Sequence, residues 1–505
     1  MKKHFLLILF IFLYLIFSLT TYKHYGITYD EFDMYEFGDA FKKYLLHIPD
    51  YDYAGVVPLR DVKVNVFYPA VLAFLNPSGS YEIYNLLNLF FALPIFVAAY
   101  LLLLKQYKKQ QYAILGPIFL FLTPRFSGDI PTNVKDISFA VVFFCSLAAV
   151  YFSSFKRALV LRIVLLGVLF GLSQNFRVLG YSLYLILLIY DFYNYFVTES
   201  KIKLKTLSLY ALKNIYSYLF IFAIAFLITL FIWPNYGTNP VNHLIDTIGL
   251  SAKYPHEDPI LTFGQNLIST RLPWYYLPGW IGVTTPVFIL ALLVISVFMI
   301  KRLLTNKLFF LFYLTFLIHT LIYFLLDPTI YEGLRHYLFL VVIITFLAAI
   351  TFIELLKKVK NKYFIILIMI IVVINSAMVI KDMIQLHPYE YIYFNELIGG
   401  LPGAYGKFET DYYGASFKEA VEWLKENRIK KDKTYKIYAC GDMFSSNHYF
   451  TPNMIWSVNL NSIDYGICWT RWNQHQTYFS NFKKIHEITR FGVPLTIIFA
   501  SNKKN

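Results

Sequence analysis

Apolar stretches long enough to cross a lipid bilayer recur along the first three quarters of this chain. A spanning helix needs about 20 such residues, and only 15% of all residues are charged, against about 25% in soluble domains. This composition excludes a cytosolic enzyme, a secreted disulfide scaffold and a disordered protein. We therefore expect an α-helical polytopic membrane protein with about eleven spans, at residues 5–22, 82–104, 112–123, 137–153, 159–175, 178–197, 211–233, 281–300, 308–326, 334–356 and 363–380.

Lysine and arginine are distributed unevenly between the connections of these spans. They gather at the N-terminus and in every second connection after it, at Lys2–Lys3, Lys105–Lys109, Lys156–Arg162, Lys201–Lys213, Lys301–Lys307 and Lys357–Lys362. Connections rich in basic residues face the cytoplasm. The pattern predicts a multi-pass protein of the cell (inner) membrane, with a cytoplasmic N-terminus and an external C-terminus. It also explains the net charge of +14 without nucleic acid, for which the sequence has no motif.

The long polar segments all fall on the external side. They are the loops 23–81 and 234–280 and the tail 381–505, and the short polar loop 124–136 lies on the same side. We expect residues 1–380 to form the transmembrane domain and 381–505 a small external α/β domain. In the tail, Ser416 and Glu419 match a capping box before a helix, while Thr434–Ala439 and Val493–Ala500 resemble strands. The pairing of Cys440 with Cys468 stays open, because their spacing specifies nothing.

Charged residues stand directly beside the expected spans on this external side. Asp30 and Glu31 follow the first span closely, where partial desolvation can make a carboxylate basic enough to take a proton from a hydroxyl. Lys135 and Asp136 lead into another span, although Asp136 could simply complement a helix N-terminus. Boundary charges are functional candidates by default, and loops carrying several cations suit a phosphate. The basic candidates are Arg125, Lys135, Arg177, Arg335 and His336.

Taken together, these motifs resemble the membrane-embedded glycosyltransferases of the GT-C fold. The group most similar in pattern is the protein O-mannosyltransferase-like family (glycosyltransferase family 39), which includes bacterial aminoarabinose transferases. Its first-loop motif is similar to Tyr29-Asp30-Glu31, and its second-loop motif to Pro124-Arg125 with Lys135-Asp136. The stretches Leu272–Tyr276 and Gly333–His336 also resemble bacterial members. The tail lacks the β-trefoil insert of the eukaryotic enzymes.

The resemblance implies transfer of a sugar, with inversion, from a polyprenyl-phosphate donor at the outer face of the membrane. Asp30 would be the general base, and Glu31 and Asp136 would position the acceptor or orient the cations. Arg125, Lys135, Arg177, Arg335 and His336 would bind the lipid phosphate. The acceptor stays open between a glycan, a lipid and a protein, and membrane lipids surround the protein.

Two further points remain open at this level. The histidines and cysteines show no zinc-binding spacing, so no metal-ligating residue is expected, although a divalent ion stays open as a cofactor. A transporter or flippase of lipid-linked sugars is the alternative function. Transporters carry polar groups near the middle of the membrane and often contain repeated halves, and neither is evident here. Convergence of the charged loops in space would favour the transferase.

Overall fold

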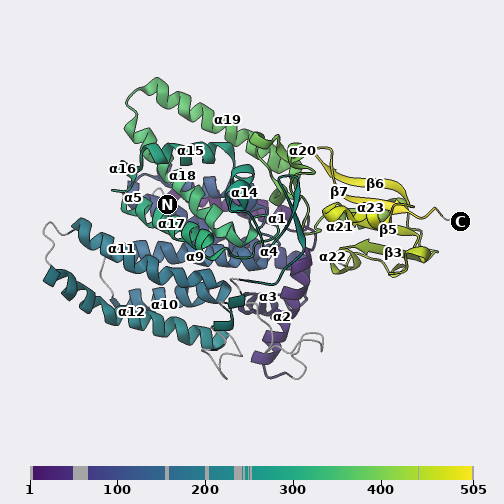
Figure 1. Ribbon diagram of the computed structural model, residues 1–505, viewed down its shortest axis with the longest axis horizontal. Coiled ribbons are helices and arrows are strands. Elements are labelled where there is room, and N and C mark those ends of the chain that lie inside the picture. The colour runs from purple at the N-terminus through teal and green to yellow at the C-terminus, as the bar shows by residue number, and fades with distance from the viewer. Residues whose placement is uncertain are drawn as a thin grey trace.

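A bundle of helices forms most of the molecule, with a small sheet-containing domain at one end (Figure 1). This computed structural model describes residues 4–48, 66–153, 159–198, 204–232 (backbone alone over 204–213), 242, 245–247, 249–250, 253–441 and 443–502. The external loops 23–81 and 234–280 are thus described only in part. The expected helical membrane body with a C-terminal α/β domain is confirmed.

The helices of the body coincide closely with the apolar stretches. A backbone segment in lipid has no water to bond, so its N–H and C=O groups must form hydrogen bonds within the segment, as they do in a helix. Every one of the expected spans is helical over most of its length. The longer helices are α1 (Phe5–Thr21), α4 (Tyr81–Phe91), α5 (Leu93–Tyr107), α9 (Val134–Ser153), α10 (Leu159–Phe176), α11 (Ser182–Thr198), α12 (Leu204–Ile232), α15 (Val287–Phe298), α17 (Lys307–Leu326), α18 (Leu338–Lys358) and α19 (Lys362–Leu386).

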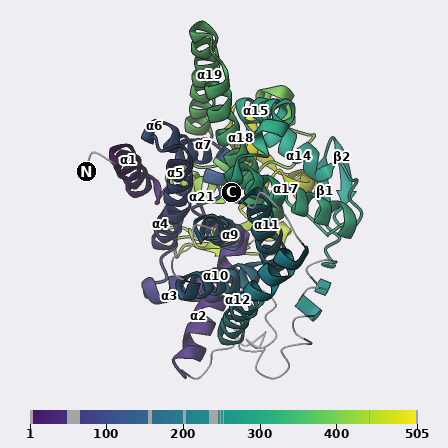
Figure 2. The same cartoon turned by 90° about the vertical axis from the view of Figure 1, so that its left-hand side faces the viewer.

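Seven helices within the described residues are long and apolar enough to cross a membrane, and α1 and α15 are shorter apolar helices. The chain is a multi-pass membrane protein, while the number of eleven spans stays a prediction. The stretch 112–123 is broken into α6 (Gln110–Ala113) and α7 (Leu115–Phe121). Helix α18 lies in the centre and is almost wholly buried, whereas α19 lies at one edge and is mostly exposed (Figure 2).

Shorter elements join these helices and carry several of the polar residues. They are α2 (Tyr29–Leu45), α3 (Phe67–Leu75), α8 (Pro124–Ser127), η3 (Val178–Tyr181), β1 (Pro259–Thr262), β2 (Gln265–Ile268), α14 (Tyr276–Thr284), α16 (Ile300–Leu303), η4 (Arg335–Tyr337), η5 (Glu390–Ile392), η6 (Glu396–Ile398) and α20 (Gly400–Ala404). Strands β1 and β2 form an antiparallel hairpin.

The C-terminal domain is a five-stranded mixed sheet with a helix against it. Its strands are β3 (Tyr435–Cys440), β4 (Met454–Trp456), β5 (Tyr465–Trp469), β6 (Lys483–Arg490) and β7 (Val493–Ala500), and its short helical elements are α22 (Met443–Asn447), η7 (Leu460–Ser462), η8 (Arg471–Asn473) and α23 (Gln474–Tyr478). The strand order is β4-β3-β5-β7-β6. Strand β3 runs parallel to both of its neighbours, and β7 runs antiparallel to both of its own.

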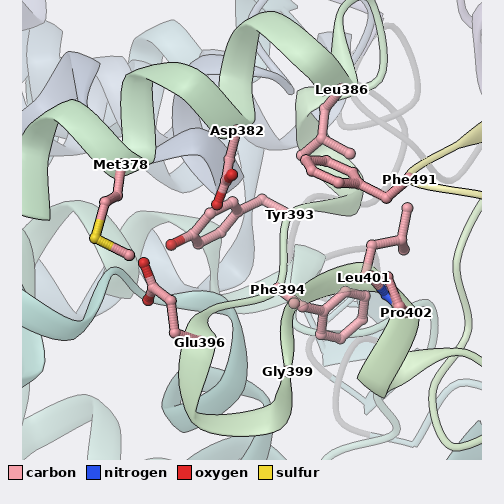
Figure 3. Close-up of a pocket in the computed structure, with 11 residues that line it drawn as sticks. Met378, Asp382, Leu386, Tyr393, Phe394, Glu396, Gly399, Leu401, Pro402 and Phe491 are labelled. Atoms are coloured by element: carbon pink, nitrogen blue, oxygen red, sulfur yellow. The ribbon is translucent and has the colours of Figure 1, made fainter.

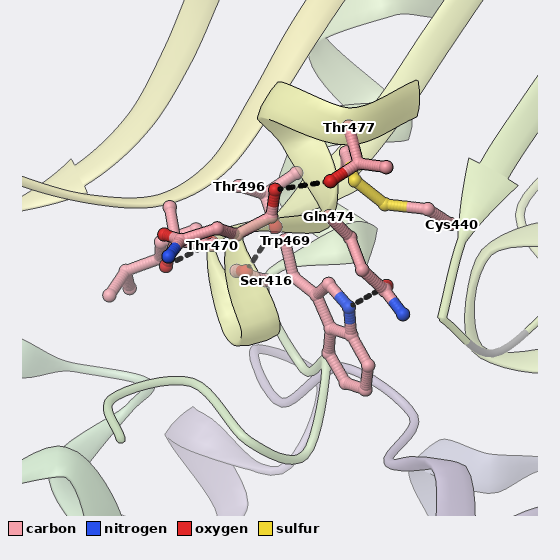
Figure 4. Close-up of a disulfide and its surroundings, with 10 residues drawn as sticks. Ser416, Cys440, Trp469, Thr470, Gln474, Thr477 and Thr496 are labelled. Atoms are coloured by element: carbon pink, nitrogen blue, oxygen red, sulfur yellow. Dashed lines mark hydrogen bonds between the residues drawn. A yellow bond between two sulfur atoms is a disulfide. The ribbon is translucent and has the colours of Figure 1, made fainter. Parts of the chain in front are cut away.

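A disulfide joins the two central parallel strands of this sheet. Cys440 and Cys468 face each other in register on β3 and β5, with their Cα atoms 5.0 Å apart (Figure 4). This separation lies in the usual range for a disulfide. The structure thus resolves a pairing that the spacing of the cysteines leaves open, and Cys145 is a free cysteine.

The hydrophobic core of the C-terminal domain begins later than residue 381. Its buried side chains start at Phe417 of α21 (Phe417–Asn427) and continue through the sheet. The preceding segment, which includes Tyr389, Tyr391 and Phe408, belongs to the core of the helical body instead. The aromatic residues of 389–415 therefore pack into the core of the helical body and not into the core of the C-terminal domain.

The capping box expected at Ser416 and Glu419 is wrong, although the helix begins where it predicts. The hydroxyl of Ser416 does not cap α21; it donates to the Asp411 carboxylate and lies 2.6 Å from the Thr496 hydroxyl. Glu419 pairs with Arg490 at 2.8 Å and accepts a hydrogen bond from Tyr389. Both side chains therefore hold the helix against its surroundings instead of closing its first turn.

Candidate functional site

The two adjacent carboxylates that follow α1 have different roles. Glu31 occupies the third position of α2 and completes a capping box with Thr28. Its Oε2 accepts hydrogen bonds from the Thr28 amide at 2.7 Å and from the Thr28 hydroxyl at 3.0 Å, and Oε1 accepts one from Tyr35. Burial raises the pKa of Glu31 to about 8, although these hydrogen bonds lower it in part. Glu31 thus serves the helix terminus.

Asp30 faces away from this cap and lies between two cations. Its Oδ1 is 2.9 Å from Lys135 Nζ, and its Oδ2 is 2.6 Å from an Arg335 Nη. Burial alone would raise the pKa of Asp30, but Arg335 and then Lys135 outweigh it and hold that pKa below the ordinary value. Asp30 is therefore ionised at neutral pH, and its basicity depends on whether those two cations remain in place.

Arg335 is the junction of the site. Besides Asp30 it contacts Asp136, with Nε 3.5 Å from Oδ2, and forms an ion pair with Glu332. The Tyr29 hydroxyl lies 3.3 Å from the same guanidinium. Gly333 and Glu332 both have a positive φ, and a Cβ at Gly333 would approach the Trp280 ring to 3.2 Å. This tight turn directs Arg335 and Glu332 into the same cluster.

Asp136 extends the cluster toward the end of α10. It lies in the first turn of α9, where a carboxylate complements the helix dipole, and its own amide donates to Asn133 at 3.0 Å. Its carboxylate also forms an ion pair with Arg177, which stands between α10 and η3. Asp136 therefore both complements the start of α9 and pairs with the Arg177 guanidinium.

The C-terminal domain contributes a cation that the sequence analysis misses. Arg471 Nη1 lies 3.2 Å from Glu332, and its Nε lies 3.2 Å from Glu409. It also donates to the Tyr412 carbonyl at 3.0 Å. Burial raises the pKa of Glu409 to about 7, with Arg471 opposing the shift. Glu332 directly precedes a stretch that the sequence analysis singles out, but Glu409 and Arg471 have no local signal.

These residues form one continuous chain of ion pairs, which we call the charged network. It consists of Asp30, Lys135, Asp136, Arg177, Glu332, Arg335, Glu409 and Arg471. One edge is accessible, with side-chain exposures of 24% at Lys135, 23% at Arg177 and 17% at Asp30. The interior is closed, with Arg335 at 3% and Asp136 at 2%. Within the described part of the chain, the accessible members of the network are therefore Asp30, Lys135 and Arg177.

The other two expected phosphate ligands, Arg125 and His336, have partners of their own, although His336 lies within electrostatic range of Arg177, Arg335 and Lys135. Arg125 is 1% exposed, donates to the Tyr391 carbonyl at 2.5 Å and lies 3.8 Å from Asp129. Its ring contact is with Tyr412. The ring of His336 packs edge-on against Tyr331, with 4.5 Å between centroids. Over the described part of the chain, no ion pair joins either residue to the charged network.

The site offers little to a metal ion. Among the described residues, no group of three or more His, Cys, Asp or Glu side chains is arranged to hold one. The carboxylates of the charged network already face guanidinium or ammonium groups. Over the described residues, the accessible part of the network is one carboxylate, Asp30, beside the two cations Lys135 and Arg177.

Comparison with known proteins gives structural neighbours alone. No protein-family model and no curated sequence matches the chain. ArnT from Cupriavidus metallidurans bound to undecaprenyl phosphate matches at 11% identity with a TM-score of 0.47, over 98% of this chain and 97% of that one. Its apo state gives 9% identity and a TM-score of 0.49, over 97% of each chain.

A second similar structure is the archaeal oligosaccharyltransferase AglB from Archaeoglobus fulgidus in complex with an inhibitory peptide and a dolichol-phosphate. It matches at 10% identity with a TM-score of 0.45, over 88% of this chain and 66% of that one. ArnT and AglB are GT-C fold membrane glycosyltransferases, the group that the motifs resemble.

Proposed function

We propose that this protein is a membrane glycosyltransferase that takes a sugar from a polyprenyl-phosphate donor and transfers it to a hydroxyl acceptor. The observation that carries the proposal is the accessible edge of the charged network, where Asp30 is held between Lys135 and Arg335. The residues come from three distant parts of the chain, so the fold brings together one carboxylate and several cations. Such a set is what transfer from a lipid phosphate requires.

In the proposed reaction the acceptor oxygen attacks the anomeric carbon while Asp30 takes the hydroxyl proton. The bond between that carbon and the phosphate oxygen breaks, and polyprenyl phosphate leaves with the electron pair. The sugar configuration inverts, because attack and departure occur on opposite faces. Positive charge develops on the sugar in such transition states, and no strong acid is needed since phosphate leaves readily as an anion.

The cations would serve as electrostatic stabilisers of the departing phosphate. Lys135 and Arg177 are the accessible ones, and charge-assisted hydrogen bonds to phosphate are strong in a partly buried site. When Lys135 turns from Asp30 to a phosphate, Asp30 loses part of the attraction that lowers its pKa. Donor binding would thus make Asp30 a better base at the moment when the acceptor arrives.

The remaining expected residues take other roles in this proposal. Arg335 is buried against three carboxylates, so we propose that it positions Asp30 and Asp136 rather than binding phosphate directly. Asp136 orients Arg177. Glu31 holds the start of α2, and Arg125 and His336 support the surrounding structure. The sugar and the acceptor are not assigned.

We further propose that the site and the C-terminal domain face outward from the inner membrane. The distribution of lysine and arginine supports this orientation, and so does the disulfide Cys440–Cys468, since disulfides persist in oxidising compartments. A phosphatase reporter at the C-terminus should be active. A fluorescent cytoplasmic reporter that works at that position would contradict the orientation.

The function can be tested by comparing cells with and without the gene. Mass spectrometry of lipid extracts should show a polyprenyl-phosphate sugar accumulating without the gene, while one surface glycan, lipid or protein loses that sugar. Purified protein in nanodiscs should then transfer the sugar from the isolated lipid. Unchanged surface glycans and unchanged lipid-linked sugars would overturn the proposal, and a donor that crosses the bilayer without being cleaved would favour a flippase.

A further inference from the structure

A pocket outside the charged network lies beside the C-terminal end of α19. Its volume is about 340 Å³, at the small end of the range for ligand sites. The segment 393–402 forms one wall and α19 the other (Figure 3). Its lining includes Asp382, Leu386, Tyr393, Phe394, Glu396 and Phe491. It shares no residue with the charged network.

Among the described residues, two carboxylates and a phenol of this pocket have no hydrogen-bond or ion-pair partner; the polar atoms of Glu396 and Tyr393 are buried, whereas Asp382 is partly exposed. Asp382, Tyr393 and Glu396 point toward one another in Figure 3. Over the described residues, no ion pair within 4 Å joins a cation to Asp382 or Glu396. Both carboxylate oxygens of Glu396 are buried without a hydrogen bond, and so is the hydroxyl of Tyr393, whose side chain is 1% exposed. Burying such groups unpaired costs free energy, so their retention points to a ligand.

The donor count indicates the kind of cation. A primary ammonium has three N–H donors, and Asp382, Glu396 and Tyr393 offer three separate acceptors. A hard divalent cation would need six or more oxygen ligands, and the described residues hold no metal-binding group of three. The other walls are apolar, with Leu386, Phe394 and Phe491 among them. Such walls suit carbon atoms attached to the charged group.

We propose that this pocket binds the primary ammonium group of an organic ligand, independently of the proposed sugar transfer. The position on α19 indicates where the ligand comes from. This helix is apolar and mostly exposed along its length, so it faces lipid, and the pocket lies where it meets the polar C-terminal segment. An aminoethyl lipid head group and a soluble amine share the required chemistry, and the experiment separates them.

The test uses the full-length protein in detergent with EDTA present throughout. Native mass spectrometry compares retention of phosphatidylethanolamine with that of phosphatidylcholine of the same acyl chains. Phosphoethanolamine, the head group without the chains, is titrated in parallel. The variants are the double Asp382→Asn/Glu396→Gln and the milder Tyr393→Phe. Glu426→Gln, an exposed carboxylate of α21, is the matched control.

We expect the protein to retain the ethanolamine lipid in preference to the choline lipid. In the double variant this preference should fall at least about tenfold, because removing one partner of a buried charge pair strongly weakens binding. Binding of phosphoethanolamine alone, lost in the double variant, would also support the ammonium site and would make its source soluble. Equal retention of the two lipids together with no binding of phosphoethanolamine would overturn the proposal. So would a preference of wild-type size in the double variant.

Discussion

Within the described residues, carboxylates gather in two regions of this protein: in one they pair with cations, and in the other they have no cation partner. In the charged network the carboxylates of Asp30, Asp136 and Glu332 all face Arg335 within ion-pair distance. In the pocket beside α19, Asp382 and Glu396 face each other and a tyrosine. A carboxylate paired inside the chain is stabilised by the fold itself, whereas the proposal for the pocket assigns that role to a ligand.

The largest effect should follow removal of the cation that three carboxylates share. Arg335→Met would leave Asp30, Asp136 and Glu332 facing a neutral side chain. Breaking one buried ion pair costs about 3–5 kcal/mol, so we expect poor accumulation and a sharply lower melting temperature in detergent. A variant with wild-type stability would show that water solvates these carboxylates and that the burial of the network does not contribute to stability.

The pH dependence of stability should distinguish Glu31 from its neighbour. Because the pKa of Glu31 is raised in the fold to about 8, the folded state binds a proton that the unfolded state releases above its ordinary value near 4.5. Glu31 therefore lowers stability progressively as pH rises between those values. Glu31→Gln should lose less stability than wild type between pH 5 and pH 8, measured by melting in detergent.

The control for this comparison is Asp33→Asn, an acidic residue in the same helix. It removes an acidic side chain from α2 and leaves the capping box of Thr28 and Glu31 in place. Parallel profiles for wild type and Glu31→Gln would contradict the buried, proton-binding state of Glu31.

At the accessible edge, a cation should matter for donor binding more than for folding. Lys135→Met removes the more accessible of the two cations beside Asp30 and leaves Arg335 in place, so the loss of stability should be smaller than for Arg335→Met. Loss of a charge-assisted contact to phosphate should weaken binding of polyprenyl phosphate on the order of tenfold. Binding in nanodiscs measures this, with the exposed Lys431→Met as the control. Unchanged affinity would remove Lys135 from the phosphate site.

The smallest effect should come from the pocket. Asp382→Asn removes a charge that has no partner within the described chain, so the free energy of unfolding should stay within about 1 kcal/mol of wild type or rise. A strong loss of stability would mean that Asp382 has a structural partner and that the contrast between the two regions fails.

The sequence predicts the body and the accessible edge well, for a physical reason. Membrane spans are recognised from local runs of apolar residues, and charges at span ends stand out against them. Asp30, Lys135, Arg177 and Arg335 all have such positions. Glu409 and Arg471 lie in polar surroundings where one more charge gives no signal. Their role depends on how the C-terminal domain packs against the helical body, and no local sequence pattern predicts that packing.

The two capping-box patterns show the same limit on a smaller scale. Thr28 and Glu31 form the box, while Ser416 and Glu419 have the same spacing and do not. Near Ser416, Asp411 and Thr496 compete for the hydroxyl, and Arg490 takes Glu419. Tertiary partners thus override a pattern that local sequence favours.

The central claim is that Asp30 accepts the proton of the acceptor hydroxyl, and Asp30→Asn tests it most directly. Asparagine keeps the size and hydrogen bonding but cannot take a proton. With purified protein, the lipid-linked donor and the acceptor, transfer should fall on the order of 10²–10⁴-fold, while donor binding persists and Glu31→Gln keeps most of its turnover. Near-normal turnover by Asp30→Asn would contradict the mechanism, and the base would be Glu31 if Glu31→Gln alone were inactive.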